Sequence, residues 1–152
     1  MKDTASLLWC LSLNCLIMIP ENTKPTNFFK FEGLRIYHKS VDFTNAILSL
    51  SNTAQTAAQK IIIDQFLNEA SHISANIIEG AGHSKAEFIE YLQKAKSNIG
   101  KCVMLCALAS KQSLIDETQE NDIRNELMEL TKMVGALILS FQKHDSVNNA
   151  EV

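Results

Sequence analysis

The sequence predicts an all-α fold: an up-down-up-down antiparallel four-helix bundle that assembles into a homo-oligomer. Three observations support this prediction. Apolar residues recur at alternating steps of three and four along four separate segments, which is the spacing of one face of an α-helix. Short polar or glycine-containing connections join the segments, so consecutive helices are expected to run antiparallel. Only two prolines occur in 152 residues, of which 46% are apolar.

The first 30 residues are expected to lie outside the core. Residues 7–19 form an apolar run that is too short to span a bilayer as a helix. Residues 20–30 contain both prolines among polar neighbours and are typical of a linker. Because periodic packing begins only near Leu34, we expect residues 1–30 to be dispensable for folding.

Two other interpretations of this run stay open. Its length matches the apolar part of a signal peptide, but Asp3 follows Lys2 and no small-x-small cleavage pattern precedes Pro20. Translation that starts at Met18 would make the first residues a dispensable tail. We favour an interpretation in which the segment has no essential role over one in which it directs secretion.

The remaining chain divides into a bundle over residues 31–144 and a polar tail over 145–152. We expect helices over residues 32–50, 57–80, 85–111 and 116–143. In the first helix the inward residues are expected to be Leu34, Tyr37, Val41 and Leu48, with Ile36, Phe43 and Ile47 beside them. The other three helices have unbroken apolar stripes: Ile63, Phe66, Ala70, Ile73 and Ile77; Phe88, Leu92, Ala95, Ile99, Cys102, Cys106 and Ala109; Ile123, Leu127, Leu130, Val134, Leu137 and Phe141.

The clearest local signals lie between the second and third helices. Gly80 and Gly82 follow the apolar stripe, and glycine takes a left-handed turn at a helix C-terminus without steric cost. Ser84 and Glu87 have the spacing of a capping box, in which each side chain accepts a hydrogen bond from the other's backbone amide. Asp116 with Gln119 offers a further N-cap before the fourth helix. The sequence therefore predicts a helical hairpin around residues 80–84.

The same stretch resembles a known signature. Residues 74–80 read Ser-Ala-Asn-Ile-Ile-Glu-Gly, and a polar corner with Ser84, then Glu87-Phe88 and Leu92, follows. This pattern is similar to that of the 23S ribosomal RNA intervening-sequence proteins, a four-helix-bundle family that includes the accessory variability determinant of diversity-generating retroelements. The resemblance covers residues 31–143. It departs from the family where an arginine pair is usual, because this chain has Leu67 and Asn68 there.

The resemblance implies a fold, an assembly and a type of partner. Proteins of this family are similar to ones that assemble as ring-like homopentamers. The resemblance also implies an accessory role with a protein partner such as a reverse transcriptase. The resemblance also marks a set of motif residues, to which we assign structural roles: Asn76, Glu79, Gly80, Ser84, Glu87 and Phe88. Asn76 is expected to bond to a neighbouring helix, and Glu79 to pair with a lysine or cap the corner.

Charge gives limited support for binding of nucleic acid. The net charge is −3, so the whole chain does not attract phosphate. Residues 84–112 nevertheless carry five lysines against two glutamates, and Lys94 and Lys101 are seven residues apart with Asn98 between them, on a face we expect to be outward. Lys94, Lys96 and Lys101 are therefore the candidate contacts for a partner or for phosphate, and we expect nucleic-acid binding to be weak.

Enzymatic signals are absent from the sequence patterns. Glu69 and His72 have a Glu-x-x-His spacing, but carboxylate-bridged metal sites need a second such pair, which the other histidines do not supply. No nucleophile or phosphate-loop motif occurs. Cys102 and Cys106 lie on an apolar stripe, where cysteine acts as a small hydrophobic residue. We therefore expect a non-enzymatic protein without catalytic residues, cofactor or metal, in the reducing cytoplasm and away from the membrane.

Two helical segments are more apolar than a single bundle requires. Residues 102–109 read CVMLCALA and residues 133–139 read MVGALIL. A helix that is apolar on most sides needs cover on most sides, so these segments favour self-association over the alternative, a tightly packed monomer with some exposed alkyl surface. We expect a binding or scaffold module that docks a protein or ribonucleoprotein partner on an oligomer. The alternative is a nucleic-acid-binding accessory protein that uses the lysines of the third helix.

Overall fold

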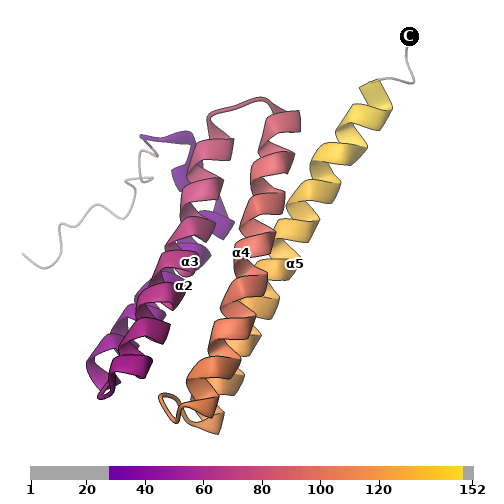
Figure 1. Cartoon of the computed structure of the whole chain (residues 1–152). Coiled ribbons are helices and arrows are strands. Elements are labelled where there is room, and N and C mark those ends of the chain that lie inside the picture. The colour runs from indigo at the N-terminus through magenta and orange to yellow at the C-terminus, as the bar shows by residue number, and fades with distance from the viewer. Residues whose placement is uncertain (1–27, 149–152) are drawn as a thin grey trace, which may run out of the picture.

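The computed structural model describes the backbone of residues 28–148 and the side chains of residues 28–142. This part of the chain contains four α-helices and no strand: α2 (Arg35–Ser49), α3 (Ala57–Ala81), α4 (Lys85–Lys111) and α5 (Glu117–Asn148). Two 3₁₀ turns, η1 (Lys30–Gly33) and η2 (Leu50–Thr53), flank α2. Consecutive helices run in opposite directions, as Figure 1 shows. The all-α prediction is confirmed, and the arrangement is consistent with a four-helix bundle.

Most helix boundaries agree with the predicted ones. α4 has the predicted bounds, α3 ends one residue later than predicted at Ala81, and α5 continues to Asn148. The first helix starts later than predicted, because Leu34 is extended (φ −89°, ψ 115°) and separates η1 from α2. None of the described helices is long and apolar enough to cross a membrane. The expectations for residues 1–27 lie outside the described residues.

Capping boxes start three of the four helices. The predicted box at the start of α4 is present, since the Ser84 amide donates to Glu87 Oε2 at 3.1 Å and the Glu87 amide donates to Ser84 Oγ at 3.4 Å. The corresponding bonds between Asp116 and Gln119 start α5. A third capping box, formed by Thr56 and Gln59, starts α3 and has the Thr-x-x-Gln form of the capping-box signature. Short polar residues at these three positions therefore fix where each helix begins.

The predicted apolar stripes of α3, α4 and the first half of α5 are buried. They form one continuous core in which the largest fully enclosed side chains come from all four helices. Towards the end of α5 the stripe is only partly covered, at Leu137 and Phe141. Figure 1 shows the reason, since α5 diverges from α4 towards its C-terminal end.

The predicted inward face of the first helix is wrong at two of its four residues, whereas Leu34 and Tyr37 are partly buried against the core. Val41 and Leu48, expected inside, are 41% and 52% exposed, whereas the buried residues of α2 are Ile36, Ser40, Phe43 and Ile47. Ser40 interrupts this apolar stripe, so the sequence pattern alone does not identify the stripe as the inward face. The Ser40 hydroxyl donates to the Tyr37 carbonyl at 2.7 Å and accepts from the Ser74 hydroxyl at 2.9 Å, so its burial leaves no polar atom unpaired.

The predicted reason for the glycines at the end of α3 is also wrong. None of the described glycines has a positive φ, and Gly82 has φ −83° and ψ −14°. Gly80 lies within α3 and is buried against α4. A Cβ placed on it would lie 2.8 Å from Tyr91 Cβ and still closer to the Phe88 ring. Gly80 therefore allows the close approach of α3 to α4, the two helices that share the most extensive contact.

Candidate functional site

A chain of polar side chains bridges α3 and α4 at mid-length. The Asn98 amide nitrogen donates to Glu69 Oε2 at 2.6 Å, and the Asn98 amide oxygen accepts from Asn76 Nδ2 at 3.2 Å. Lys101 Nζ donates to the same carboxylate at 3.1 and 3.3 Å. The expected bond from Asn76 to a neighbouring helix is thus present, and its partner is Asn98.

The expected outward position of Asn98 is wrong. Its side chain is 6% exposed, because the buried stripe of α4 is broad enough on the α3 side to include it. Burial raises the pKa of Glu69, but the hydrogen bonds from Asn98 and Lys101 outweigh that effect, and the pKa lies below its ordinary value of 4.5. The folded protein therefore holds Glu69 as a carboxylate, and this network stabilises the α3–α4 pair.

We predict that Asn98→Asp destabilises the fold, because it places a second carboxylate beside Glu69. The loss should be on the order of 2 kcal/mol at neutral pH, since a donor is removed and a like charge is added. The stability contributed by Glu69 should be present above its unfolded pKa and decline as the pH falls below 4.5, because its folded pKa is the lower one. Urea denaturation at pH 7 and pH 4 measures both effects. Equal stability of the variant and the wild type at pH 7 would contradict the network.

The corner between α3 and α4 gathers most of the other motif residues. Glu79 pairs with His83 at 3.2 Å, not with a lysine, and the His83 ring stacks on Tyr91 with centroids 5.3 Å apart. The Phe88 ring packs against the ring of Phe141 in α5, with the two ring centroids 5.4 Å apart. Together with the capping box of Ser84 and Glu87, these contacts fix the geometry of the turn and the seam with α5. These contacts hold the turn together, and none of them indicates that the motif residues bind a ligand.

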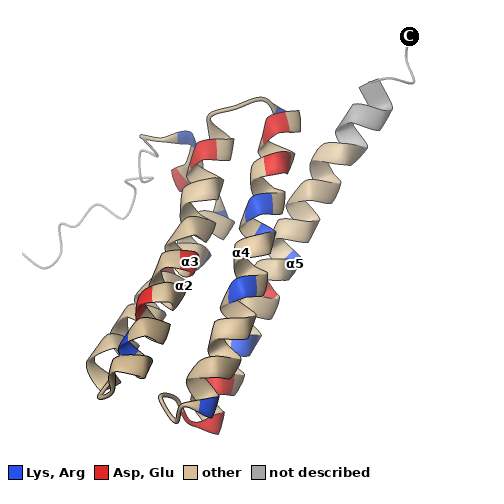
Figure 2. Ribbon diagram, viewed as in Figure 1, with Lys and Arg blue, Asp and Glu red and all other residues tan. Residues whose placement is uncertain are grey.

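The three candidate lysines lie apart. Lys101 is engaged by Glu69, and Lys94 Nζ lies 4.4 Å from the centroid of the Tyr91 ring. Lys96 is exposed. It is two residues after Lys94, so its side chain leaves the helix about 200° around the axis from that of Lys94. Figure 2 shows the acidic residues of α4 near the start of the helix and most of its lysines along the rest of it. A phosphate-binding role for these lysines stays a prediction, and one chain does not bring them together.

The cysteines of α4 are enclosed. Burial raises the pKa of Cys102 to about 12 and that of Cys106 to about 11. Thiols with such pKa values stay protonated at neutral pH and make poor nucleophiles or metal ligands. Among the described residues, no group of three or more His, Cys, Asp or Glu side chains is arranged to hold a metal ion.

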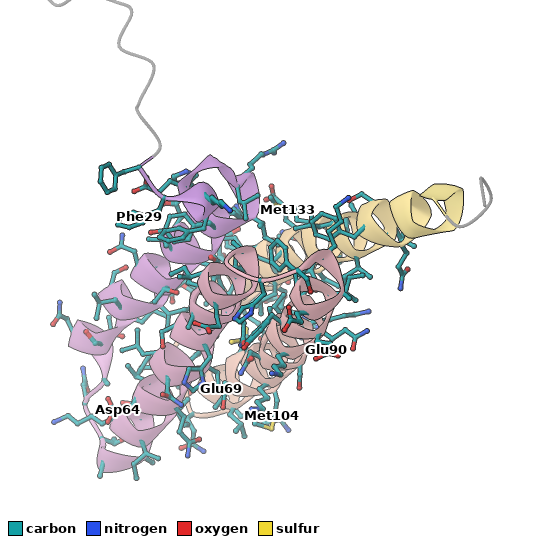
Figure 3. The ribbon with its side chains drawn as sticks, turned by 90° about the horizontal axis from the view of Figure 1, so that it is seen from above. Phe29, Asp64, Glu69, Glu90, Met104 and Met133 are labelled. Carbon is teal, nitrogen blue, oxygen red and sulfur yellow. The ribbon has the colours of Figure 1, made fainter. Side chains whose placement is uncertain are left out.

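An apolar surface covers the outer side of α4 and α5. We call it the α4/α5 face; it comprises Gly100, Val103, Met128, Thr131 and Gly135. Met128 is 55% exposed, and a shallow groove of about 150 Å³ is lined by Val103, Leu127, Met128 and Thr131, with Arg124 at the same groove. The glycines extend this face along the helices, and a Cβ added to either one would meet nothing within 4 Å. Met104 and Leu108 continue the exposed apolar surface of α4 towards α3, where Met104 lies near Glu69 (Figure 3).

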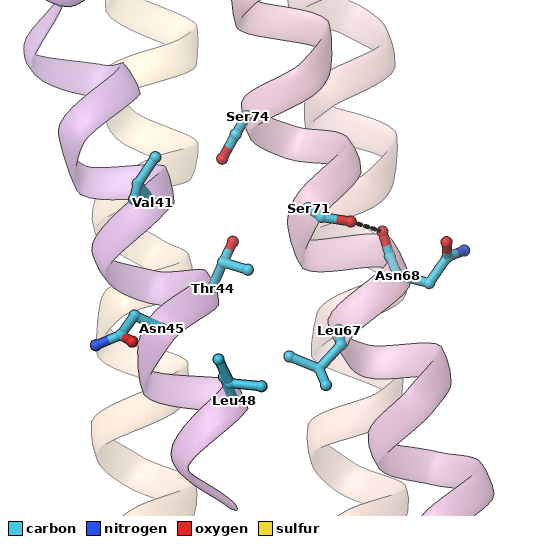
Figure 4. A pocket seen from close by; sticks show the side chains of 8 residues that line it. All are labelled: Val41, Thr44, Asn45, Leu48, Leu67, Asn68, Ser71 and Ser74. Atoms are coloured by element: carbon cyan, nitrogen blue, oxygen red, sulfur yellow. Dashed lines mark hydrogen bonds between the residues drawn. The ribbon is translucent and has the colours of Figure 1, made fainter. Parts of the chain in front are cut away.

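A second apolar surface lies between α2 and α3. We call it the α2/α3 groove; it has a volume of about 600 Å³, and its lining is mostly apolar. Leu48 of α2 and Leu67 of α3 point toward each other across it (Figure 4). The residues that line it are Val41, Thr44, Asn45, Leu48, Leu67, Asn68, Ser71 and Ser74. The sequence pattern does not reveal this groove, because it predicts that Val41 and Leu48 lie in the core.

Comparison with known proteins identifies the family. No curated protein matches the chain. Among solved structures, the chain is similar to a protein of unknown function from the S23 ribosomal protein family of Bacteroides thetaiotaomicron. The two share 25% sequence identity with a TM-score of 0.62, over 68% of this chain and 94% of that one. The family model of the 23S rRNA-intervening sequence proteins matches residues 32–136, which span α2, α3, α4 and most of α5. The chain therefore belongs to the 23S rRNA-intervening sequence protein family.

Proposed function

We propose that this protein is a non-enzymatic, homo-oligomeric scaffold that docks a protein or ribonucleoprotein partner in the cytoplasm. The observation that carries the proposal is the α4/α5 face, which is apolar and exposed in the described single chain. The two segments that appeared too apolar for one bundle contribute Val103 and Gly135 to this face and Met104 and Leu108 to the surface beside it. Burial of such a surface between subunits is favourable by about 25 cal/mol per Å².

The two glycines of this face give independent support for a close neighbour. A glycine inside an exposed helix costs about 1 kcal/mol relative to alanine. Gly80 has a reason within the chain, because α4 lies against it, but Gly100 and Gly135 face open space. A backbone of a second subunit that approaches at these positions would account for them. We therefore place the α4/α5 face at the contact between copies.

The favoured assembly is a homopentamer, by resemblance to relatives in the family. A ring with an odd number of subunits needs two different surfaces on each copy, one for each neighbour. The outer surface of such a ring presents each docking contact five times, which suits an accessory protein that binds a large partner such as a reverse transcriptase.

Met128→Glu is expected to weaken the assembly without unfolding the subunit. The exposed side chain tolerates a charge in the free chain, whereas a buried interface does not. Light scattering at several concentrations should give a lower mass for this variant than for the wild type. Asn52→Glu is a matched control, because Asn52 is exposed in η2, outside both helices of the α4/α5 face, and the mass of this variant should be unchanged. An unchanged mass for Met128→Glu would exclude this face as the contact.

Nucleic-acid binding through α4 is the second candidate, favoured by the surplus of lysines there. We expect affinity for RNA or duplex DNA weaker than about 10 μM at physiological salt, in the non-specific range, because each chain carries a charge of −3. Titration of labelled RNA at two salt concentrations measures it. A Lys94→Glu, Lys96→Glu double variant leaves the Glu69–Lys101 pair intact. Submicromolar binding that this variant abolishes would favour the second candidate.

A further inference from the structure

From the position of the α2/α3 groove, we infer that the chain's own apolar segment, residues 7–19, occupies it. The groove is a surface without cover in the described residues, about 600 Å³ in volume. Val41 and Leu48 are both more than 40% exposed there, so two large aliphatic residues face water together on one side of α2. An occupant with an apolar surface is needed to remove them from water.

The described chain begins on the correct side of α2 for this occupant. The rings of Phe28, Phe29, Phe31 and Tyr37 contact one another in succession, with centroids 5.0 to 5.4 Å apart. Tyr37, Val41, Thr44 and Leu48 follow one another at steps of four, three and four, so they share one face of α2. The aromatic series therefore leads from Phe28 to the stripe of α2 that lines the groove. Phe28 itself is 86% exposed, as a residue on the path of a further segment would be.

The distances permit the connection. Thr44, at the middle of the groove, lies nine residues along α2 from Arg35, or about 14 Å along the helix axis. Residues 20–27 can span about 26 Å when extended. The segment can therefore reach the whole length of the groove without strain on the linker.

The chemistry of the two surfaces also agrees. Residues 7–19 are mostly leucine and isoleucine but include Ser12 and Asn14. The groove likewise combines aliphatic side chains with hydroxyl and amide groups, which come from Thr44, Asn45, Asn68, Ser71 and Ser74. A segment tethered to the same chain has an effective concentration in the millimolar range, far above that of a free partner at micromolar concentration. This tether favours the chain's own segment over a second copy as the occupant.

This inference departs from the expectation that residues 1–30 are dispensable. That expectation rests on periodic packing that begins only near Leu34, and the predicted burial of Val41 and Leu48 leaves no surface there for the segment to cover. Their exposure provides the surface. The inference is independent of self-association through the α4/α5 face, which lies on other helices.

Tryptophan fluorescence of the full chain tests the inference directly, because the single tryptophan, Trp9, lies in the segment. In the wild type, emission should lie at a shorter wavelength than in urea, and acrylamide should quench it weakly. Leu48→Glu should shift the emission toward that of the unfolded chain while the helical circular dichroism stays unchanged. Leu139→Glu is the matched control, since Leu139 is 58% exposed outside the groove, and its emission should equal that of the wild type.

Three results would overturn the inference. The first is a wild-type emission equal to that of the chain in urea. The second is an emission that Leu48→Glu leaves unchanged. The third is an emission that moves to longer wavelength on dilution together with a falling mass in light scattering, which would show that a second copy fills the groove.

Discussion

An Ile77→Asp variant is expected to be largely unfolded at room temperature. Ile77 is fully enclosed on the central stripe of α3, so the new carboxylate would be buried without a partner. Such a change costs several kcal/mol, a large part of the 5–15 kcal/mol that stabilises a typical domain. Circular dichroism and a thermal melt measure the loss of helix directly.

Ile78→Asp is the matched control for this variant. Ile78 is the next residue on the same helix and is 37% exposed, so a carboxylate there remains hydrated. Its melting temperature should stay within a few degrees of the wild type. If the two variants melt together, the assignment of the inward face of α3 is incorrect.

Gly80→Ala is expected to lower stability by about 1–3 kcal/mol, the usual cost of overpacking a core. The added Cβ would lie 2.8 Å from Tyr91 Cβ, an atom next to the backbone that cannot move independently of α4. α3 and α4 would therefore have to separate along the most extensive pairing in the bundle. Urea denaturation of the purified variant gives the change in the free energy of unfolding.

The same substitution at another glycine provides the comparison. At Gly100 an added Cβ meets nothing within 4 Å, so alanine should raise the stability of the helix by about 0.5–1 kcal/mol. Denaturation at a concentration that dissociates the assembly separates this effect from any contact between subunits. Equal stability of Gly80→Ala and Gly100→Ala would show that close packing at Gly80 is not what requires a glycine.

The sequence predicted three helices well for identifiable physical reasons. In α3 and α4 the inward positions are apolar except for Ser74 and Asn98, and Ser84 with Glu87 marks the boundary between the two helices. α2 was harder, because Ile36, Phe43 and Ile47 on one side compete with Val41 and Leu48 on the other. Its inward face includes Ser40, which only its bond to Ser74 of α3 makes compatible with burial. The choice between the two faces depends on packing between helices, which a single helical pattern does not contain.

The polar bridge between α3 and α4 shows a related limit. The sequence indicated that Asn76 bonds to another helix, but the partner depends on how far α4 is shifted along α3. That shift is set by the corner and by the close approach at Gly80. In the sequence, Glu69 stands out only as half of a Glu-x-x-His metal motif. In the structure it accepts hydrogen bonds from Asn98 and Lys101. The α2/α3 groove was missed for the same reason as the face of α2.

The molar mass of the unmodified protein tests the central claim most directly. Each chain has a mass of 16.9 kDa, and light scattering coupled to gel filtration gives the mass of the assembly without a shape assumption. At micromolar concentration we predict a single species of about five chain masses, the number that the family resemblance favours. A single species at the mass of one chain would contradict self-association, and with it the scaffold function assigned to the α4/α5 face.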